Sequence, residues 1–129
     1  MIEPLLTYDN KLAIVDAGES CNVVCKFSFG SQSFNKASIL SLRLTLYDRA
    51  TGQAINGRVN QDIYDANGGT IADDGTLTIR LQPEDNIIVN EALQREEIED
   101  HIVSLRWTWN DGVYIRVGVE QLVLRVRKI

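Results

Sequence analysis

The sequence has little of several features on which particular functions depend. Its 129 residues include one histidine and two prolines, and 13 basic side chains are outnumbered by 18 acidic ones, which gives a net charge of −5. No apolar run approaches the ~18 residues of a membrane-spanning helix, and the first residues lack the basic and apolar regions of a signal peptide. Dedicated nucleic-acid-binding proteins usually carry a basic excess, which is absent here. We therefore expect no membrane or nucleic-acid partner, and synthesis in the cytoplasm.

The single histidine restricts the catalytic chemistry. A Ser-His-Asp or Cys-His site needs a histidine beside its nucleophile, and the only candidate, His101, follows the acidic run 96–100. We interpret His101 as a surface residue between a loop and a strand, and the acidic run as a solvated face. The segment that starts at Asp65 begins like a calcium loop, but Gly69 and Thr70 stand where such a loop needs an oxygen ligand and a glycine. The sequence therefore predicts a protein that is not an enzyme, with no catalytic residue, no metal ligand and no cofactor.

The two cysteines, Cys21 and Cys25, lie in a stretch whose alternate positions from 21 to 29 are apolar. This period of two is typical of a strand with one buried face. Along a strand their Cα atoms would lie about 13 Å apart, whereas a disulfide tolerates less than about 7 Å. Cys21 and Cys25 are therefore predicted to be reduced thiols that face the core.

Most of the chain alternates between apolar and polar residues, with turn residues about every ten positions, which favours an all-β sandwich. One strand, with its leucines at 40, 42, 44 and 46 facing inward, is predicted to end in a turn at 48–52 that leads to a partner strand at 53–58. Pro83 predicts a helical turn within 82–88. The acidic stretch 90–100 predicts a solvated segment or a short helix.

The chain shows no internal repeat, low-complexity tract or linker. Residues 16–129 are therefore predicted to form a single β-sandwich domain. Residues 1–15 are predicted to be an N-terminal arm, because the apolar residues Leu5 and Leu6 lie between breaks at Pro4 and at Tyr8. An arm of this kind can pair with an exposed strand of a neighbouring molecule.

Arginines concentrate in the last quarter of the chain and suggest an interface. Arginine is favoured at protein interfaces because its planar guanidinium forms paired hydrogen bonds with carboxylates. Cross-strand pairs with Asp111 or Glu120 would explain part of the same pattern. Together with the arm, the candidate interface residues are Leu5, Leu6, Tyr8, Arg106, Arg116, Arg125 and Arg127.

One series of segments has a recognisable order, and it comprises 44–48, 51–58, 66–70, 74–81, 83–85 and the strand 103–109 with its hairpin partner. These segments, which span roughly residues 38–126, together resemble small immunoglobulin-like structural proteins of tailed bacteriophages. It implies an immunoglobulin-like antiparallel β-sandwich of about seven to nine strands, with one or two short helical turns. It also implies a virion component of the capsid-decoration, neck or baseplate-adaptor type. No catalytic residue belongs to such families, so none is transferred to this chain.

The resemblance implies a non-enzymatic function in the virion. The chain would bind itself, as a homo-oligomer or in several copies per particle, or a capsid, neck or baseplate protein. Contacts would run through strand edges and terminal segments. An alternative is a carbohydrate-binding module, because Trp107 and Trp109 share one face of a strand and Tyr114 lies just beyond the turn that follows. Tryptophans that pack in the core and at its edge would instead be structural.

Overall fold

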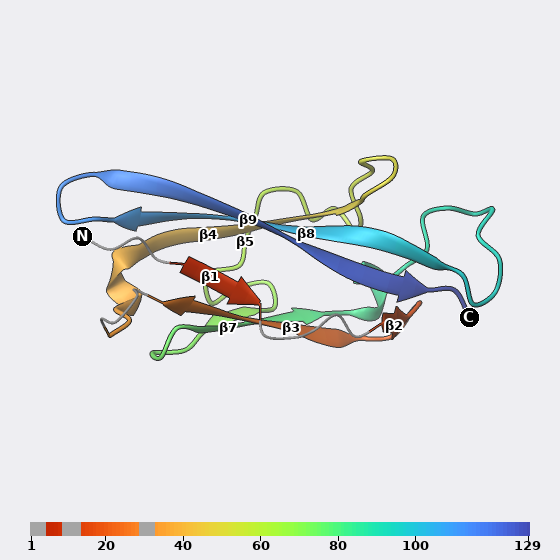
Figure 1. Cartoon of the computed structure of the whole chain (residues 1–129), viewed down its shortest axis with the longest axis horizontal. Helices are drawn as coiled ribbons and strands as arrows, with labels where there is room; N and C mark the ends of the chain where they lie inside the picture. Colours follow the sequence, from red (N-terminus) through yellow and green to blue (C-terminus); the bar gives the residue numbers. More distant parts are fainter. Residues whose placement is uncertain (1–4, 9–13, 29–32) are drawn as a thin grey trace.

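The described residues form two stacked β-sheets (Figure 1). A computed structural model of the chain describes residues 5–8, 14–28 and 33–129. In spatial order, the first sheet contains β1 (Leu5–Tyr8), β3 (Cys21–Ser28), β7 (Thr76–Leu81) and β6 (Gly69–Ile71). The second contains β2 (Ile14–Asp16), β9 (Ile115–Arg127), β8 (Ile98–Asn110), β4 (Ile39–Asp48) and β5 (Gln61–Asp62). The predicted all-β sandwich is confirmed.

Helical structure in the described part of the chain is limited to two short 3-10 turns, η1 (Lys36–Ser38) and η2 (Pro83–Asp85). The second turn confirms the helical turn that Pro83 predicts. No helix among the described residues is long and apolar enough to cross a membrane.

The order of the strands is that of an immunoglobulin-like sandwich. In immunoglobulin domains one sheet holds strands A, B, E and D, and the other holds G, F and C, to which variable-type domains add C′. The order β1-β3-β7-β6 corresponds to the first sheet, and β9-β8-β4-β5 corresponds to the second. The strand pairs are antiparallel, as predicted, except that β2 pairs in parallel with the end of β9, from Ile14↔Arg125 to Asp16↔Arg127.

The core lies between the sheets and consists of the inward residues of both. Leu42, Leu44 and Leu105 have no exposed surface. Phe27 of β3 meets Trp107 of β8 edge to face, with ring centroids 5.3 Å apart. Strands B and F, which β3 and β8 represent, are joined by a disulfide in antibody domains. Here an aromatic contact connects the two sheets between the same strands.

Both cysteines are free, as the spacing predicts. Cys25 is fully buried, whereas Cys21 at the beginning of β3 is half-buried beside Asn86. Burial raises the pKa of the Cys21 thiol, and a hydrogen bond from Asn86 only partly opposes this shift. The thiol therefore stays protonated at neutral pH, which lowers its reactivity.

The inward set of β4 differs from the prediction at Leu40. The pairing of β4 with β8 shifts between Ile39 and Ser41, which marks a β-bulge. A bulge adds one residue to one strand and reverses the direction of the side chains before it. As a result Ile39 is buried at 2% exposure, whereas Leu40 is 48% exposed.

The turn after β4 forms as predicted, but the strand predicted at 53–58 does not. Gly52 N–H donates to Asp48 C=O at 2.8 Å, which closes the turn. Beyond it Ala54 forms an isolated bridge with Tyr47, and Leu46 accepts Ile55 N–H and donates to Arg58 C=O, both at 2.9 Å. The backbone of Asn56 and Gly57 adopts positive φ angles of 53° and 65°, which interrupt the strand. The short strand β5 takes the place beside β4.

The N-terminal segment is part of the sandwich wherever it is described. β1 pairs with β3, and Leu6 is 8% exposed in the core. Val15 of β2 is 7% exposed and packs in the same core. Residues 1–4 and 9–13 of the predicted arm lie outside the described residues. The described parts of 1–15 therefore connect both sheets and do not form a detached arm.

Candidate functional site

The hairpin between β8 and β9 projects at one end of the long axis of the molecule (Figure 1). Its turn follows the prediction from Asn110, Asp111 and Gly112. Asp111 Oδ1 accepts the N–H groups of Val113 at 2.8 Å and Tyr114 at 2.6 Å, and Asp111 Oδ2 accepts Arg116 Nε. Hydrogen bonds from Tyr114, Arg116 and Val113 lower the pKa of Asp111 to about 2. Asp111 therefore organises the turn as a carboxylate.

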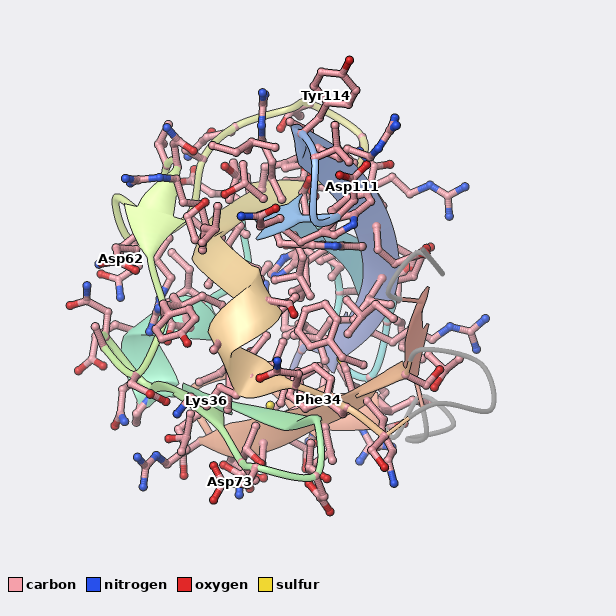
Figure 2. All side chains as sticks on the ribbon, turned by 90° about the vertical axis from the view of Figure 1, so that its left-hand side faces the viewer. Phe34, Lys36, Asp62, Asp73, Asp111 and Tyr114 are labelled. Carbon is pink, nitrogen blue, oxygen red and sulfur yellow. The ribbon has the colours of Figure 1, made fainter. Side chains whose placement is uncertain are left out.

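Apolar side chains are exposed on and beyond this turn. Figure 2 shows Tyr114 projecting from the body of the protein, with Asp111 beneath it. We define the hairpin patch as the five exposed apolar residues of this region, which are Val113 (76%), Tyr114 (65%), Ile115 (68%), Val117 (49%) and Val119 (59%). Ile115, Val117 and Val119 alternate along β9 and therefore share one face of the strand. Clustered exposed apolar side chains mark interaction sites more often than isolated ones do.

Among the described residues, the same stretch of β9 has a neighbouring strand on one side only. β9 pairs with β8 along its whole length, from Asn110↔Ile115 to Ile98↔Arg127. On its other side, β2 covers only the stretch from Arg125 to Arg127. Between 115 and 124, no strand of the described residues lies against this side of β9.

Hydrogen bonds at the two ends of β9 show which of its residues face the open side. Asp111 N–H donates to Tyr114 C=O at 3.0 Å, and hydrogen-bonded pairs alternate along an antiparallel ladder, so the even-numbered residues of β9 bond to β8. On the opposite side, Ala17 N–H donates to the C=O of odd-numbered Arg127 at 2.8 Å. We define the free edge as the odd-numbered residues whose N–H and C=O groups point away from β8, which are Ile115, Val117, Val119, Gln121 and Val123.

Basic side chains lie next to the hairpin patch on the outer face of the five-stranded sheet. Arg106 of β8 is opposite Val119 on one side and Arg43 of β4 on the other. Both arginines are exposed, and Arg43 donates to Asn60 C=O at 3.1 Å. An acidic protein therefore presents a local surface that combines apolar side chains with positive charge.

The residues predicted from the sequence as an interface do not form one surface. Arg106 and Arg116 lie at the hairpin, whereas Arg127 is paired with Asp16 at 2.7 Å and Arg125 lies opposite Asp100, both beside the covered part of β9. The prediction for Leu6 is wrong, because this side chain is buried between the sheets. Leu5 and Tyr8 lie in the edge strand β1, and their side chains are outside the described part of the structure.

The sequence contains a signal for the hairpin patch that the predictions did not use. Apolar residues occupy odd positions from 113 to 119 but even positions from 122 to 126. Because alternate residues of a strand point to opposite faces, one strand cannot bury both sets against the same sheet. The change of phase at 120–121 marks the boundary between the exposed and the buried half of β9.

The three aromatic residues of the carbohydrate-binding alternative do not share an exposed surface. Trp107 and Trp109 are 4% and 5% exposed and face the core from β8. Tyr114 is exposed at the tip of the hairpin. Neither indole presents a face to solvent on which a sugar ring can stack.

His101 is buried, which contradicts its predicted place at the surface. It has no exposed surface, and its Nε2 lies 2.5 Å from Oε2 of Glu99, which is itself 8% exposed. Asp48, opposite His101 on β4, is 2% exposed. Glu99 is therefore not part of a solvated face, because the segment before β8 folds back over it.

The carboxylates of this cluster accept hydrogen bonds from neighbouring backbone N–H groups. Glu99 accepts the N–H groups of Val89 at 2.8 Å and Asn90 at 3.0 Å, and Asp48 accepts hydrogen bonds from the N–H and the hydroxyl group of Thr51. Both carboxylates border a pocket of about 1060 Å³ between the turn at 48–53 and the segment 89–100. One ligand atom from each of Asp48, Glu99 and His101 lies within 4.8 Å of the others, which is compatible with a cation. The hydrogen bonds of Asp48 and Glu99 hold the turn at 48–53 and the segment 89–100 together, which is a structural role. The segment 89–100 contains no helix.

A second buried group joins Arg58 and Asp85. Arg58 donates to both oxygens of Asp85, at 2.6 and 3.0 Å, and also to Gln61 and Asn67. Burial raises the pKa of Asp85, but hydrogen bonds from Arg58, Asn56 and the Gln82 backbone outweigh it and hold this pKa below its ordinary value. The pair ties η2 to the segment that follows β4.

Comparison with known protein families and with curated proteins gives no match. No model of a known protein family matches the chain, and no curated protein matches it.

Proposed function

We propose that the chain is a non-enzymatic structural protein of a tailed-phage virion. In this role it binds capsid, neck or baseplate proteins, or further copies of itself, through the hairpin patch and the free edge of β9. The resemblance of residues 38–126 to immunoglobulin-like phage proteins supports the virion class. The immunoglobulin-like strand order agrees with that resemblance.

The observation that carries the binding role is the hairpin patch itself. Its five apolar residues are 49–76% exposed on one hairpin, with Arg106 opposite Val119 and the Arg116 guanidinium 5.9 Å from the Tyr114 ring. Aromatic and arginine side chains are enriched at protein interfaces, where the apolar part is buried and the arginines pair with carboxylates. The partner surface is therefore expected to be apolar and bordered by Asp or Glu.

The free edge adds a second means of binding. A strand from a partner can extend an exposed sheet by bonding to its unpaired N–H and C=O groups. In this mode the main chain supplies much of the affinity, and the side chains of the hairpin patch supply the specificity. Natural proteins usually protect long apolar edges, so an open one is expected to have a partner.

The position of the only histidine also supports binding over catalysis. His101 has no exposed surface and is hydrogen-bonded to Glu99. A general base must come within hydrogen-bond reach of its substrate, and burial prevents this.

The proposal is tested by incorporation into particles. Phage particles are purified from the strain that carries the gene, and peptides of this chain are quantified by mass spectrometry, with Val119→Lys and Val59→Lys introduced separately. Val119 and Val59 are both 59% exposed, but only Val119 belongs to the hairpin patch, so the two variants are matched. We expect several copies of the parent and of Val59→Lys per particle and loss of Val119→Lys. Absence of the parent from the particles, or equal incorporation of both variants, would contradict the proposal.

A further inference from the structure

The open half of β9 has a self-complementary sequence centred on Gly118. At equal distances from Gly118 lie first Val117 and Val119, then Arg116 and Glu120. A two-fold axis places residue i of one molecule opposite residue j of the other, and j opposite i. An antiparallel pair of β9 strands related by an axis at Gly118 therefore opposes valine to valine and arginine to glutamate.

We propose that two copies of the chain dimerise by antiparallel pairing of their free edges, with the two-fold axis at Gly118. The inference rests on the proposed function, in which this edge is a binding surface, and it names a second copy of the chain as the occupant. The two five-stranded sheets then become one continuous sheet.

The backbone has the geometry that this pairing needs. The N–H and C=O groups of Val117 and Val119 point to the open side, because the even-numbered residues of β9 bond to β8. In the dimer, Val117 exchanges both hydrogen bonds with the second copy's Val119, and Val119 does so with the second copy's Val117. Gly118 lies opposite Gly118 in the position between these pairs.

The charges select this register from the other symmetric ones. An axis at Arg116 or at Glu120 would place a like charge directly opposite, which destabilises a pair of strands. An axis at Val117 would place Gly118 opposite Arg116, and an axis at Val119 would place Gly118 opposite Glu120. In either case that charged residue would lack a charged partner. Only the axis at Gly118 opposes each arginine to a glutamate.

Both charged residues expose part of their side chains to solvent. Glu120 is half-buried, and the structure shows it no hydrogen bond or ion pair within the described residues. Arg116 bonds to Asp111 through Nε and leaves 52% of its side chain exposed. A guanidinium carries five N–H donors, so Arg116 can bond to the second copy's Glu120 while it keeps Asp111.

Gly118 itself cannot be used for the test. A Cβ at this position would meet the Trp107 ring at 2.4 Å, so any substitution disturbs the core of the single chain. The test therefore changes Arg116, Glu120 and Val119. Val119→Pro removes an N–H from the open side without removing a bond to β8, and proline is tolerated at such edge positions.

Sedimentation equilibrium of the full chain measures the dissociation constant of the dimer. We expect Glu120→Arg and Arg116→Glu each to raise this constant by about tenfold. The double variant should dimerise more tightly than either single variant, because it restores the cross-strand pair, but less tightly than the parent, because the bond to Asp111 stays lost. Val119→Pro is expected to be monomeric and folded by circular dichroism. Glu91→Arg, the same charge change at an exposed residue outside β9, is the matched control and is expected to dimerise like the parent.

A parent that stays monomeric at every concentration would overturn the inference. A double variant whose dissociation constant is no lower than those of the single variants would also overturn it. The same holds if Val119→Pro dimerises like the parent, or if Glu91→Arg raises the dissociation constant as much as Glu120→Arg does. A monomeric chain that is still incorporated into particles would refute the dimer alone. A dimer that is absent from particles would refute the virion function and leave the dimer standing.

Discussion

Two Arg–Asp pairs with the same chemistry lie in opposite surroundings in this protein. Arg58 and Asp85 are 7% and 0% exposed, and each bonds to further partners in the interior. Arg116 and Asp111 lie at the hairpin turn, where 52% of the arginine side chain is exposed. A buried pair depends on both members, because removing one leaves an unpaired charge, whereas water screens an exposed pair. The first pair therefore stabilises the fold, and the second shapes a surface that is available for binding.

The two halves of β9 show the same contrast in apolar residues. Leu122, Leu124 and Val126 are buried, and β2 covers the end of the strand. Val117 and Val119 are exposed and border an open edge. Half of this strand thus contributes to the core, and the other half exposes its apolar side chains.

The largest expected effect comes from breaking the buried pair. Asp85→Ala leaves the Arg58 guanidinium buried without its carboxylate, which should cost about 3–5 kcal/mol of unfolding free energy. Asp111→Ala loses the hydrogen bonds that organise the turn, but it should cost clearly less unfolding free energy than Asp85→Ala, because water screens this exposed pair. Urea titration of both variants measures the difference. Equal losses would show that the two pairs do not differ as described.

The next effect compares the two halves of β9. Leu124→Ala should lower the unfolding free energy by about 2–5 kcal/mol, because it removes buried methyl groups and leaves a cavity. Val117→Ala should change it by less than about 0.5 kcal/mol in the monomer. Denaturant titration at low protein concentration keeps dimerisation from contributing. A large loss for Val117→Ala would mean that a single chain already covers the free edge.

A smaller effect is expected from pH. The pKa of Asp85 is held below its ordinary value by its hydrogen bonds, so the unfolded state binds more protons as the pH falls. The unfolding free energy should therefore be largest above about pH 5 and decline towards about pH 2. Asp85→Asn removes this titrating group and should give a flatter pH profile than the parent. An identical slope in both proteins would remove Asp85 as a source of acid sensitivity.

The smallest effect concerns the thiols. Alkylation of the native protein should be slow at both cysteines, and slower at the fully buried Cys25 than at the half-buried Cys21. Burial raises the pKa of Cys21 and keeps it from forming the reactive thiolate. Mass spectrometry after timed alkylation gives both rates, with the protein in urea as the reference for full reactivity. Faster labelling of Cys25 than of Cys21 would contradict their placement.

The features that were predictable from the sequence are the local ones. The period of two located β3, β4, β7 and β8, and the spacing of Cys21 and Cys25 excluded a disulfide. The turn at Asn110 to Gly112 followed from the conformational preferences of those residues. Each of these depends on neighbours along the chain and therefore leaves a pattern in the sequence.

The features that escaped prediction depend on distant segments. Leu40 is exposed because β4 bulges against β8, and His101 is buried because the segment 89–90 bonds to Glu99. The exposed half of β9 escaped for the same reason, since alternation does not say whether a face or an edge is covered. A change in the phase of the alternation, as at 120–121, is the one local sign of such a boundary.

We propose that the residues of the free edge, the odd-numbered positions from 115 to 123, offer unpaired backbone groups to a partner. Amide hydrogen exchange measured by NMR tests it residue by residue at several protein concentrations. At low concentration, Val117 and Val119 should exchange rapidly while Gly118 and Glu120 are protected by β8, and at high concentration Val117 and Val119 should become protected too. Protection of Val117 and Val119 equal to that of Gly118 and Glu120 at the lowest concentration would contradict the claim, because the edge would then be closed within a single chain.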